Sequence, residues 1–318
     1  MSASVVEHFS SHSPPDLPSF RALCNALKAL VIDESYDLWS SGGRKPLACV
    51  LDLCCGRGGD LLKWAQRGQK LYVGLDATPL CIAEAERRLG GLFARGTVGL
   101  GASFHVCDAR RERFPCADAS INIASVQFGI QYLFEAKETV AHALSEIRRC
   151  MTPGGVFACV YPDGERVRSA LLRDGGRFGH FGLAGDAARF DAEPFGIPYV
   201  YSIAGSEPCE EYAVSRAALE DALASHGFTF GDGCVSTGAQ GFFAERAASS
   251  AAARVLDGRS CSETDWLSLA LFRVIIARLP PGAEPSQTGQ ASHSSQASHP
   301  GPPSQRPRPK RRSPRPGA

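Results

Sequence analysis

The chain has 318 residues, of which 44% are apolar, with 34 Lys and Arg against 33 Asp and Glu. This apolar share excludes wholesale disorder, and the absence of a run of about 18 apolar residues excludes a membrane-spanning helix. The amino end shows no basic flank followed by an apolar stretch, so no secretory signal is expected. The 12 Cys include no Cys-x-x-Cys spacing and no Cys/His cluster. We therefore expect reduced cysteines that pack as small apolar side chains, and no metal site.

Composition divides the chain into three parts. Residues 1–16 carry His, Ser and Pro turns and are predicted to be a flexible amino terminus, whereas residues 17–280 are predicted to fold. Residues 281–318 are rich in Pro, Ser, Gln and Gly, which predicts a disordered tail. This tail holds six basic residues and one acidic residue, which leaves 28 basic and 32 acidic residues before it. The net charge of +1 thus combines a mildly acidic body with a basic tail.

Apolar runs alternate with helical patterns through the first half of the folded part. The predicted strands are residues 48–53, 71–76, 103–108, 121–127 and 156–161. The predicted helices are residues 61–64, 78–89, 136–151 and 165–173, the second with a threonine cap and a first-turn proline. Such alternation predicts an α/β fold with a doubly wound, mostly parallel sheet.

The second half of the folded part is less regular. Residues 174–208 are rich in Gly, Phe and Pro, which predicts an insertion or lid on the sheet. Residues 216–226 are predicted to be helical, and residues 267–279 fit either a late helix end or a strand.

Three of the predicted strands end in an aspartate, namely Asp52, Asp76 and Asp108. Ligands of doubly wound sheets bind at the carboxyl ends of the strands, so three carboxylates there indicate a ligand with several hydroxyl or amine donors. The glycine-rich loop Asp52–Asp60 matches neither G-x-G-x-x-G nor a P-loop. The pattern fits a nucleoside with a free ribose, such as S-adenosylmethionine. Asp52 would then lie near its amino group, Asp76 at the ribose and Asp108 near the adenine.

The segment Leu51–Trp64, Leu-Asp-Leu-Cys-Cys-Gly-Arg-Gly-Gly-Asp-Leu-Leu-Lys-Trp, resembles the signature of the mRNA cap guanine-N7 methyltransferases. Other segments resemble that family in the same order: Phe20–Lys28, Val126–Glu135, Leu144–Gly155, Tyr161–Asp163, Arg177–Gly179, Pro194–Tyr199, Cys209–Val214 and Ser262–Trp266. The resemblance covers about residues 17–280. It implies a Rossmann-like class I methyltransferase fold with seven strands, S-adenosylmethionine as the cofactor and the 5′ end of capped RNA as the substrate.

The resemblance also implies the site residues. Its cofactor positions are Lys28, Asp52, Cys54, Gly56, Asp76, Asp108, Gln127 and Tyr132. Its cap positions are Gln131, Tyr132, Phe134, Pro162, Glu211 and Phe272. Three further residues stand where the family has basic or polar contacts to the cap, and we expect them to contact the triphosphate bridge: Arg57, Lys63 and Arg88. The catalytic positions, which act by orienting the substrate, are Glu211, Tyr132 and Gln131.

Four positions depart from the family pattern. Cys54 replaces a glycine, Cys24 an asparagine, Gln131 a histidine and Phe272 a tyrosine. Glutamine still hydrogen-bonds a purine edge but cannot become cationic, and phenylalanine keeps the ring without the hydroxyl. Most of these changes fall on the cap side, so they bear on activity more than on fold.

The chemistry implied by the resemblance needs no general base, because guanine N7 carries a lone pair and no proton. Catalysis then depends on holding the reacting atoms in line. A carboxylate at the guanine edge, for which Glu211 is the candidate, would select guanine and favour the cationic product. The alternative for Glu211 is a structural pair with an arginine. Phe128, Tyr132 and Phe134 form either a wall for a base or a plain core cluster.

Two other functions stay open at this point. One is a class I methyltransferase with a small-molecule or protein substrate, and the other is a non-catalytic cap- or RNA-binding module. The run Arg308–Arg312 fits a nuclear address, an RNA-binding arm or a solvated end. We expect a nuclear monomer, with a cytoplasmic location as the alternative. Its expected partners are capped RNA and other capping enzymes, and no membrane.

Overall fold

The computed structural model describes residues 16–40, 48–67, 71–94, 96, 101–173, 175–204, 206–246, 256 and 260–283. The predicted flexible amino terminus, except Asp16, and the predicted tail beyond Ala283 lie outside the described residues. All described residues belong to one compact unit, Met1–Ser286. Within that described part, none of the helices combines the length and apolarity needed to cross a bilayer.

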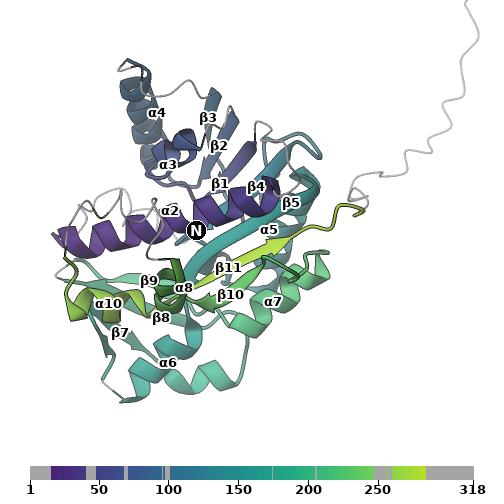
Figure 1. Ribbon diagram of the computed structural model, residues 1–318. Coiled ribbons are helices and arrows are strands. Elements are labelled where there is room, and N and C mark those ends of the chain that lie inside the picture. Colours follow the sequence, from purple (N-terminus) through teal and green to yellow (C-terminus); the bar gives the residue numbers. More distant parts are fainter. Residues whose placement is uncertain are drawn as a thin grey trace, which may run out of the picture. The chain divides into compact units, whose positions relative to one another are not determined.

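The central sheet has seven strands in the order β10-β11-β5-β4-β1-β2-β3 (Figure 1). Its strands are β1 (Cys49–Leu53), β2 (Leu71–Asp76), β3 (Gly101–Val106), β4 (Ile121–Gln127), β5 (Met151–Pro162), β10 (Val235–Gly238) and β11 (Phe272–Arg278). Strands β1 to β5 pair in parallel, and β11 runs antiparallel to both of its neighbours. The predicted doubly wound, mostly parallel sheet is therefore confirmed.

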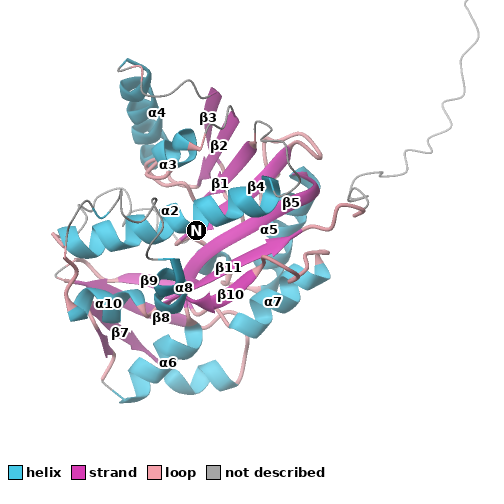
Figure 2. Ribbon diagram, viewed as in Figure 1, coloured by secondary structure: helices cyan, strands magenta, loops and turns pink. Residues whose placement is uncertain are grey.

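Helices cover both faces of this sheet (Figure 2). They are α2 (Pro18–Ser40), α3 (Leu61–Gln66), α4 (Pro79–Ala94), α5 (Lys137–Cys150), α6 (Gly164–Arg173), α7 (Arg216–Ser225), α8 (Ala239–Arg246) and α10 (Glu263–Leu269), with the short 3-10 helices η1 (Ile130–Leu133) and η2 (Ala187–Asp191). Leu51 packs with α5 and α7, whereas its neighbour Val50 packs with α2, α3 and α4. Because successive strand residues point to opposite faces, a strand covered on both sides is mostly apolar, as β1 is apart from Asp52 near its carboxyl end.

The predicted lid contains regular structure that the sequence patterns did not reveal. A second, antiparallel sheet is formed by β6 (Arg177–Phe178), β7 (Phe181–Gly185), β8 (Pro198–Ile203) and β9 (Cys209–Tyr212), in that order. The region therefore extends past residue 208, and it pairs its own backbone groups instead of lying as an irregular flap. Residues 267–279, for which the sequence left two options, contain both the end of α10 and all of β11.

Candidate active site

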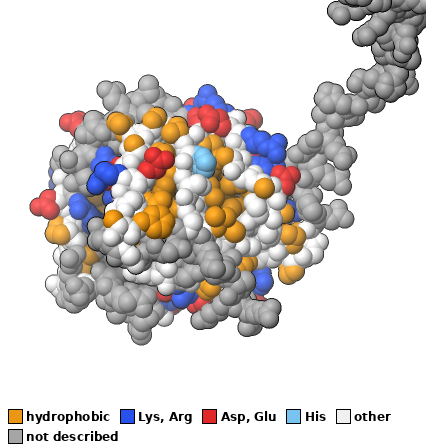
Figure 3. Space-filling model, turned by 90° about the horizontal axis from the view of Figure 1, so that it is seen from above, with side chains coloured by type: hydrophobic (Ala, Val, Ile, Leu, Met, Phe, Trp, Pro, Cys, Tyr) orange, Lys and Arg blue, Asp and Glu red, His pale blue; other side chains and the backbone are white. Residues whose placement is uncertain are grey.

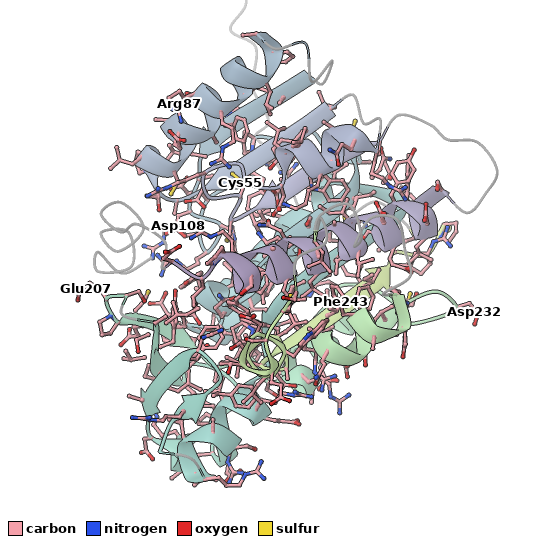
Figure 4. The ribbon with its side chains drawn as sticks, turned by 60° about the vertical axis from the view of Figure 1, so that its left-hand side comes forward. Cys55, Arg87, Asp108, Glu207, Asp232 and Phe243 are labelled. Carbon is pink, nitrogen blue, oxygen red and sulfur yellow. The ribbon has the colours of Figure 1, made fainter. Side chains whose placement is uncertain are left out.

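The functional residues gather where the parallel strands end. The carboxyl ends of β1, β2, β3, β4 and β5 lie at one edge of the sheet, and β11 begins there, because Phe272 pairs with Pro162. Figure 4 shows Cys55 and Asp108 at this edge, and Arg87 on α4. Two hollows open along it. We call them the rim cleft, at β1 to β3, and the aromatic cavity, between α2, β5 and the second sheet.

The rim cleft is lined by Cys54, Asp76, Asp108 and Tyr132, among others. Asp76 accepts hydrogen bonds from the backbone N–H of Gly56 and of Thr78, each at 2.9 Å. Burial raises the pKa of the Asp76 carboxyl, and the two backbone donors oppose that rise. Asp76, which the sequence analysis assigned to the ribose, thus fixes the glycine loop to the end of β2.

Cys54 stands in the left-handed backbone region, with φ of 57°. A side chain there costs energy that glycine would not pay. The fold accommodates it through Gly129 on the facing loop, where an added Cβ would lie 2.4 Å from the Cys54 Cβ. The thiol lies 3.8 Å from the Gly129 carbonyl oxygen, and burial raises its pKa well above the usual range. The departure at Cys54 is therefore matched by the neighbouring glycine.

A buried charged cluster lies behind the glycine loop. Asp60 accepts a hydrogen bond from Lys28 Nζ at 2.9 Å and one from Lys63 Nζ at 2.7 Å. Lys63 also donates to Asn25 Oδ1 at 3.0 Å, so the cluster joins α3 to α2. Sequence reasoning quoted Asp60 in the signature but gave it no role. Its spacing of three residues from Lys63, on the first turn of a helix, was the available signal.

The two carboxyls of this cluster titrate in opposite directions. Burial works against ionisation of Asp60, but the lysines outweigh it and hold its pKa at about 2. Asp52 is equally buried, lies near the Asp60 charge, and has its pKa raised to about 7. The hydroxyl of Tyr72 donates to Asp52 Oδ2 at 2.5 Å. Asp60 takes the two lysines directly, so Asp52 is the last of the pair to ionise.

Asp108 is held by an arginine that sequence reasoning missed. Arg110 donates to both Asp108 oxygens, at 2.9 and 2.8 Å, and pairs with Glu135, two residues after η1. The Arg110 side chain is 5% exposed, and Arg110 lines the rim cleft beside Asp108. Position 110, two residues after the predicted strand end, gave no sequence signal, because basic residues also occupy 111 and 113.

Gln127, the last residue of β4, has a side-chain oxygen without a hydrogen-bond donor among the described residues. Its Nε2 donates to Ser125 Oγ at 3.0 Å, while its buried Oε1 accepts no hydrogen bond within the described structure. Such buried acceptors are uncommon in folded proteins and suggest a missing donor. Among the described residues, no three metal-ligating side chains gather at one place.

The aromatic cavity has a volume of about 310 Å³. Its predicted walls Phe128, Pro162 and Phe272 lie together, and the rings of Phe128 and Phe272 meet edge to face at 4.8 Å. Cys24 of α2 also lines it, and burial raises the pKa of that thiol to about 12. Tyr132 lines both this cavity and the rim cleft, so the two hollows share a wall.

Glu211 is the buried carboxylate of the aromatic cavity, with 5% of its surface exposed. Its Oε1 accepts from the Tyr132 hydroxyl at 2.7 Å and from Gln131 Nε2 at 3.0 Å, and its Oε2 accepts from the Tyr199 hydroxyl at 2.7 Å. Burial raises the pKa of Glu211, and these three donors oppose the rise. The structural alternative, a pair with an arginine, does not match these contacts, because all three donors are neutral.

The second sheet supplies residues that sequence reasoning missed. Tyr199 stands opposite Glu211 in the β8–β9 ladder, and Tyr201 lines the same cavity two residues along β8. The period-2 spacing of the two tyrosines was the available signal. Arg21 of α2 is the basic residue among the cavity walls and was also missed.

Four predicted cap residues lie elsewhere. Phe134 is fully buried in the core and stacks on Phe195, with ring centroids 5.2 Å apart. Lys63 is bound to Asp60, and neither Arg57 nor Arg88 lines the cavity. A Cβ built on Gly59 of the glycine loop would lie 3.9 Å from Arg88 Nη1, so Arg88 faces that loop.

The family model and the curated relatives that match this chain belong to the same family. The sequence model of the mRNA (guanine-N(7))-methyltransferase domain matches residues 11–230. The mRNA cap guanine-N(7) methyltransferase of Drosophila melanogaster is 29% identical over 184 residues, covering 54% of this chain and 43% of the fly protein. The mRNA cap guanine-N(7) methyltransferase 1 of Oryza sativa subsp. japonica is 30% identical over 232 residues, covering 66% of this chain and 61% of the rice protein. The chain thus spans about half the length of the curated relatives it matches.

A solved structure of a putative S-adenosylmethionine dependent methyltransferase from Listeria monocytogenes has the same fold. It superposes with a TM-score of 0.52 at 15% identity, covering 82% of this chain and 98% of the bacterial chain. At that identity the likeness concerns the fold alone, which is that of class I methyltransferases. Since the family model matches more than half of the chain, this protein belongs to the mRNA (guanine-N7)-methyltransferase family.

Proposed function

We propose that this protein transfers a methyl group from S-adenosylmethionine to N7 of the guanosine cap at the 5′ end of mRNA. The observation that carries the proposal is Glu211, a buried carboxylate held by neutral donors inside an aromatic cavity that shares Tyr132 with the rim cleft. A base bound against Glu211 would lie next to a cofactor in the cleft. The names of the curated relatives support the same activity.

The rim cleft fits the cofactor by the chemistry of its donors and acceptors. Asp76 would receive the ribose hydroxyls, and Asp108, fixed by Arg110, would receive the adenine side. The unpaired Oε1 of Gln127 and the carboxyl of Asp52 offer acceptors for an amino group. When bound, S-adenosylmethionine supplies a methyl group on a positively charged sulfur. Lys28, bound to Asp60, would act on the cofactor through that cluster.

The residues around the aromatic cavity would act by orienting the base and not by transferring a proton. Phe128, Phe272 and Pro162 offer faces and edges against which a purine packs. Tyr132, Tyr199 and Gln131 fix the Glu211 carboxylate, so it need not reorganise during the reaction. The N7-methylated base is a cation, and a carboxylate whose partners among the described residues are all neutral favours its formation.

Recognition is proposed to concern the end of the RNA and not its length. The face seen in Figure 3 intersperses basic and acidic side chains instead of forming one basic surface. Residues before the tail also carry fewer basic than acidic residues. A pocket that reads one nucleotide needs only local cations for the phosphates, and Arg21 lies in the wall where it can supply one.

The remaining assignments belong to the same proposal. Residues 17–280 would form the catalytic domain, with the second sheet as part of its cap side. The relatives' link to mRNA capping supports a nuclear role, with other capping enzymes as partners of a monomer. The basic run Arg308–Arg312, the candidate nuclear address, lies outside the described residues.

Methyl transfer to GpppG, GTP, GpppA and free guanosine tests the proposal directly. We expect labelled methyl from S-adenosylmethionine to appear in GpppG far faster than in free guanosine, at N7, with GpppA labelled only through its guanosine. Tight binding of S-adenosylhomocysteine without transfer to any of these would support a non-catalytic binding module. Transfer to a protein or small metabolite in preference to GpppG would support the other methyltransferase class.

A further inference from the structure

The side-chain amide of Gln131, on η1, has a hydrogen-bonded nitrogen and an oxygen without a donor among the described residues. It is 2% exposed and lines the aromatic cavity. Its Nε2 donates to the Phe128 carbonyl oxygen and to Glu211 Oε1, both at 3.0 Å. Turning the carboxamide over would set its own carbonyl against two acceptors, so these contacts fix which end is which.

The fixed orientation leaves the carbonyl oxygen of Gln131 without a donor. Oε1 is buried and accepts no hydrogen bond within the described structure. A buried acceptor without a donor costs folding free energy, and such groups mark places where a ligand completes the pairing. At this position the ligand would be the base in the aromatic cavity.

Glu211 has little accepting capacity left for that base. Its Oε1 already accepts two hydrogen bonds, whereas Oε2 accepts one, from Tyr199. A carboxylate oxygen offers about two lone-pair sites, so the open position is on Oε2. The wall therefore presents two acceptors from two residues, Glu211 Oε2 and Gln131 Oε1.

Guanine presents two neighbouring donors, N1–H and the exocyclic 2-amino group. We propose that Glu211 accepts from N1–H while Gln131 Oε1 accepts from the 2-amino group. Gln131 is then the residue that distinguishes guanine from hypoxanthine, which has N1–H and lacks the amine. This assignment rests on the proposed function, because it requires a capped guanine in the aromatic cavity.

The test compares GpppG with its inosine analogue IpppG. Because the guanosine of IpppG is itself a possible methyl acceptor, the products are separated, and kcat/KM for IpppG refers only to transfer to N7 of its hypoxanthine. The wild-type kcat/KM for IpppG is expected to be about 100-fold lower, because the analogue leaves the Gln131 carbonyl unpaired. In Gln131→Met, a variant of similar length without the acceptor, kcat/KM for GpppG should fall to within threefold of that for IpppG. Binding of S-adenosylhomocysteine, measured by calorimetry, should stay within twofold and reports that the variant is folded.

Tyr199→Phe is the matched control, since it removes a donor to Glu211 and leaves the Gln131 carbonyl in place. It should lower kcat/KM for both substrates by the same factor and keep their ratio. If Gln131→Met does the same, Gln131 merely holds Glu211, and the assignment is overturned. A wild-type preference for GpppG below threefold overturns it without any variant. Absence of transfer to GpppG by the wild-type protein refutes the proposed function itself.

Discussion

Two regions at the same edge of the sheet hold their carboxylates in opposite ways. Behind the rim cleft, Asp60 is bound by two lysines, and beside it Asp108 is bound by Arg110. In the aromatic cavity, Glu211 is bound by two tyrosine hydroxyls and one amide. Cations fix a carboxylate and neutralise it, whereas neutral donors fix it and leave its charge. Under the proposed function, the first arrangement would build a scaffold, and the second would keep a negative charge available for the cationic product.

Glu211→Gln should give the largest effect, because it removes that reserved charge and keeps the side-chain shape. We expect kcat/KM for GpppG to fall about 1000-fold, with binding of S-adenosylhomocysteine unchanged. Stability at neutral pH should not fall. Burial raises the Glu211 pKa, which means that the fold disfavours the ionised carboxylate. The free energy of unfolding of the wild-type protein therefore falls as pH rises through that pKa, and the neutral glutamine avoids this loss.

Glu210→Gln is the control for this variant, because Glu210 is the exposed neighbour on the same strand. Its kinetics and melting temperature should match the wild type. Transfer in Glu211→Gln within tenfold of the wild-type rate would mean that the cavity charge is not used.

Asp60→Asn tests the scaffold side of the comparison. The change leaves Lys28 and Lys63, both mostly buried, without their carboxylate, and should cost about 3 kcal/mol in the free energy of unfolding. The Asp60 pKa is depressed in the fold, so its contribution is present above the unfolded pKa and is lost as pH falls towards 2. Urea unfolding at pH 7 and at pH 3 measures both statements.

Glu84→Gln provides the comparison for Asp60, since it removes an exposed pair with Arg87 on α4. Surface pairs contribute little, so its unfolding midpoint should not move. Equal destabilisation in the two variants would contradict the scaffold role of Asp60.

The affinity for S-adenosylhomocysteine should rise about tenfold between pH 6 and pH 8. An ammonium group in the cleft gains most from Asp52 once that carboxyl is ionised, and burial places its pKa at about 7. In Asp52→Asn the affinity should be lower and nearly flat over this range. Calorimetry in buffers of different ionisation enthalpy counts the protons exchanged on binding. The comparison with Asp52→Asn assigns them, and a sloped profile in that variant would exclude Asp52 as the source.

The sequence predicted the first of these regions better than the second. Asp52, Asp76 and Asp108 follow apolar runs, and parallel strands bring such ends together, so pattern alone placed them at one edge. The aromatic cavity depends on a second sheet whose strands are two to six residues long, too short for a clear period. Tyr199 meets Glu211 only through strand pairing, which no local pattern encodes.

Several residues that the resemblance assigned to the cap, including Pro162 and Phe272, line the cavity, whereas Phe134, assigned in the same way, is buried in the core. It had no means of finding Arg110 or the pairing of Lys28 and Lys63 with Asp60. These contacts depend on how α2, α3 and the strand ends come together, and they appear only once the backbone is known.

Arg110→Gln should give the smallest effect and tests whether the scaffold side acts on the cofactor alone. Arg110 touches Asp108 and Glu135 and lines the rim cleft without lining the aromatic cavity. We expect affinity for S-adenosylhomocysteine to fall about fivefold, since Asp108 loses its orientation, while KM for GpppG is unchanged. Arg110→Lys should recover part of the affinity, because an ammonium keeps the charge without the paired geometry.

Arg111→Gln is the control here, because this exposed residue meets the same carboxylate from outside at 3.2 Å. Loss of a solvated pair should change the affinity less than twofold. A rise in KM for GpppG in Arg110→Gln would show that the two regions are coupled through Tyr132, the wall they share. In that case the two regions would differ in the contacts of their carboxylates, but they would not act independently on the cofactor and on the cap.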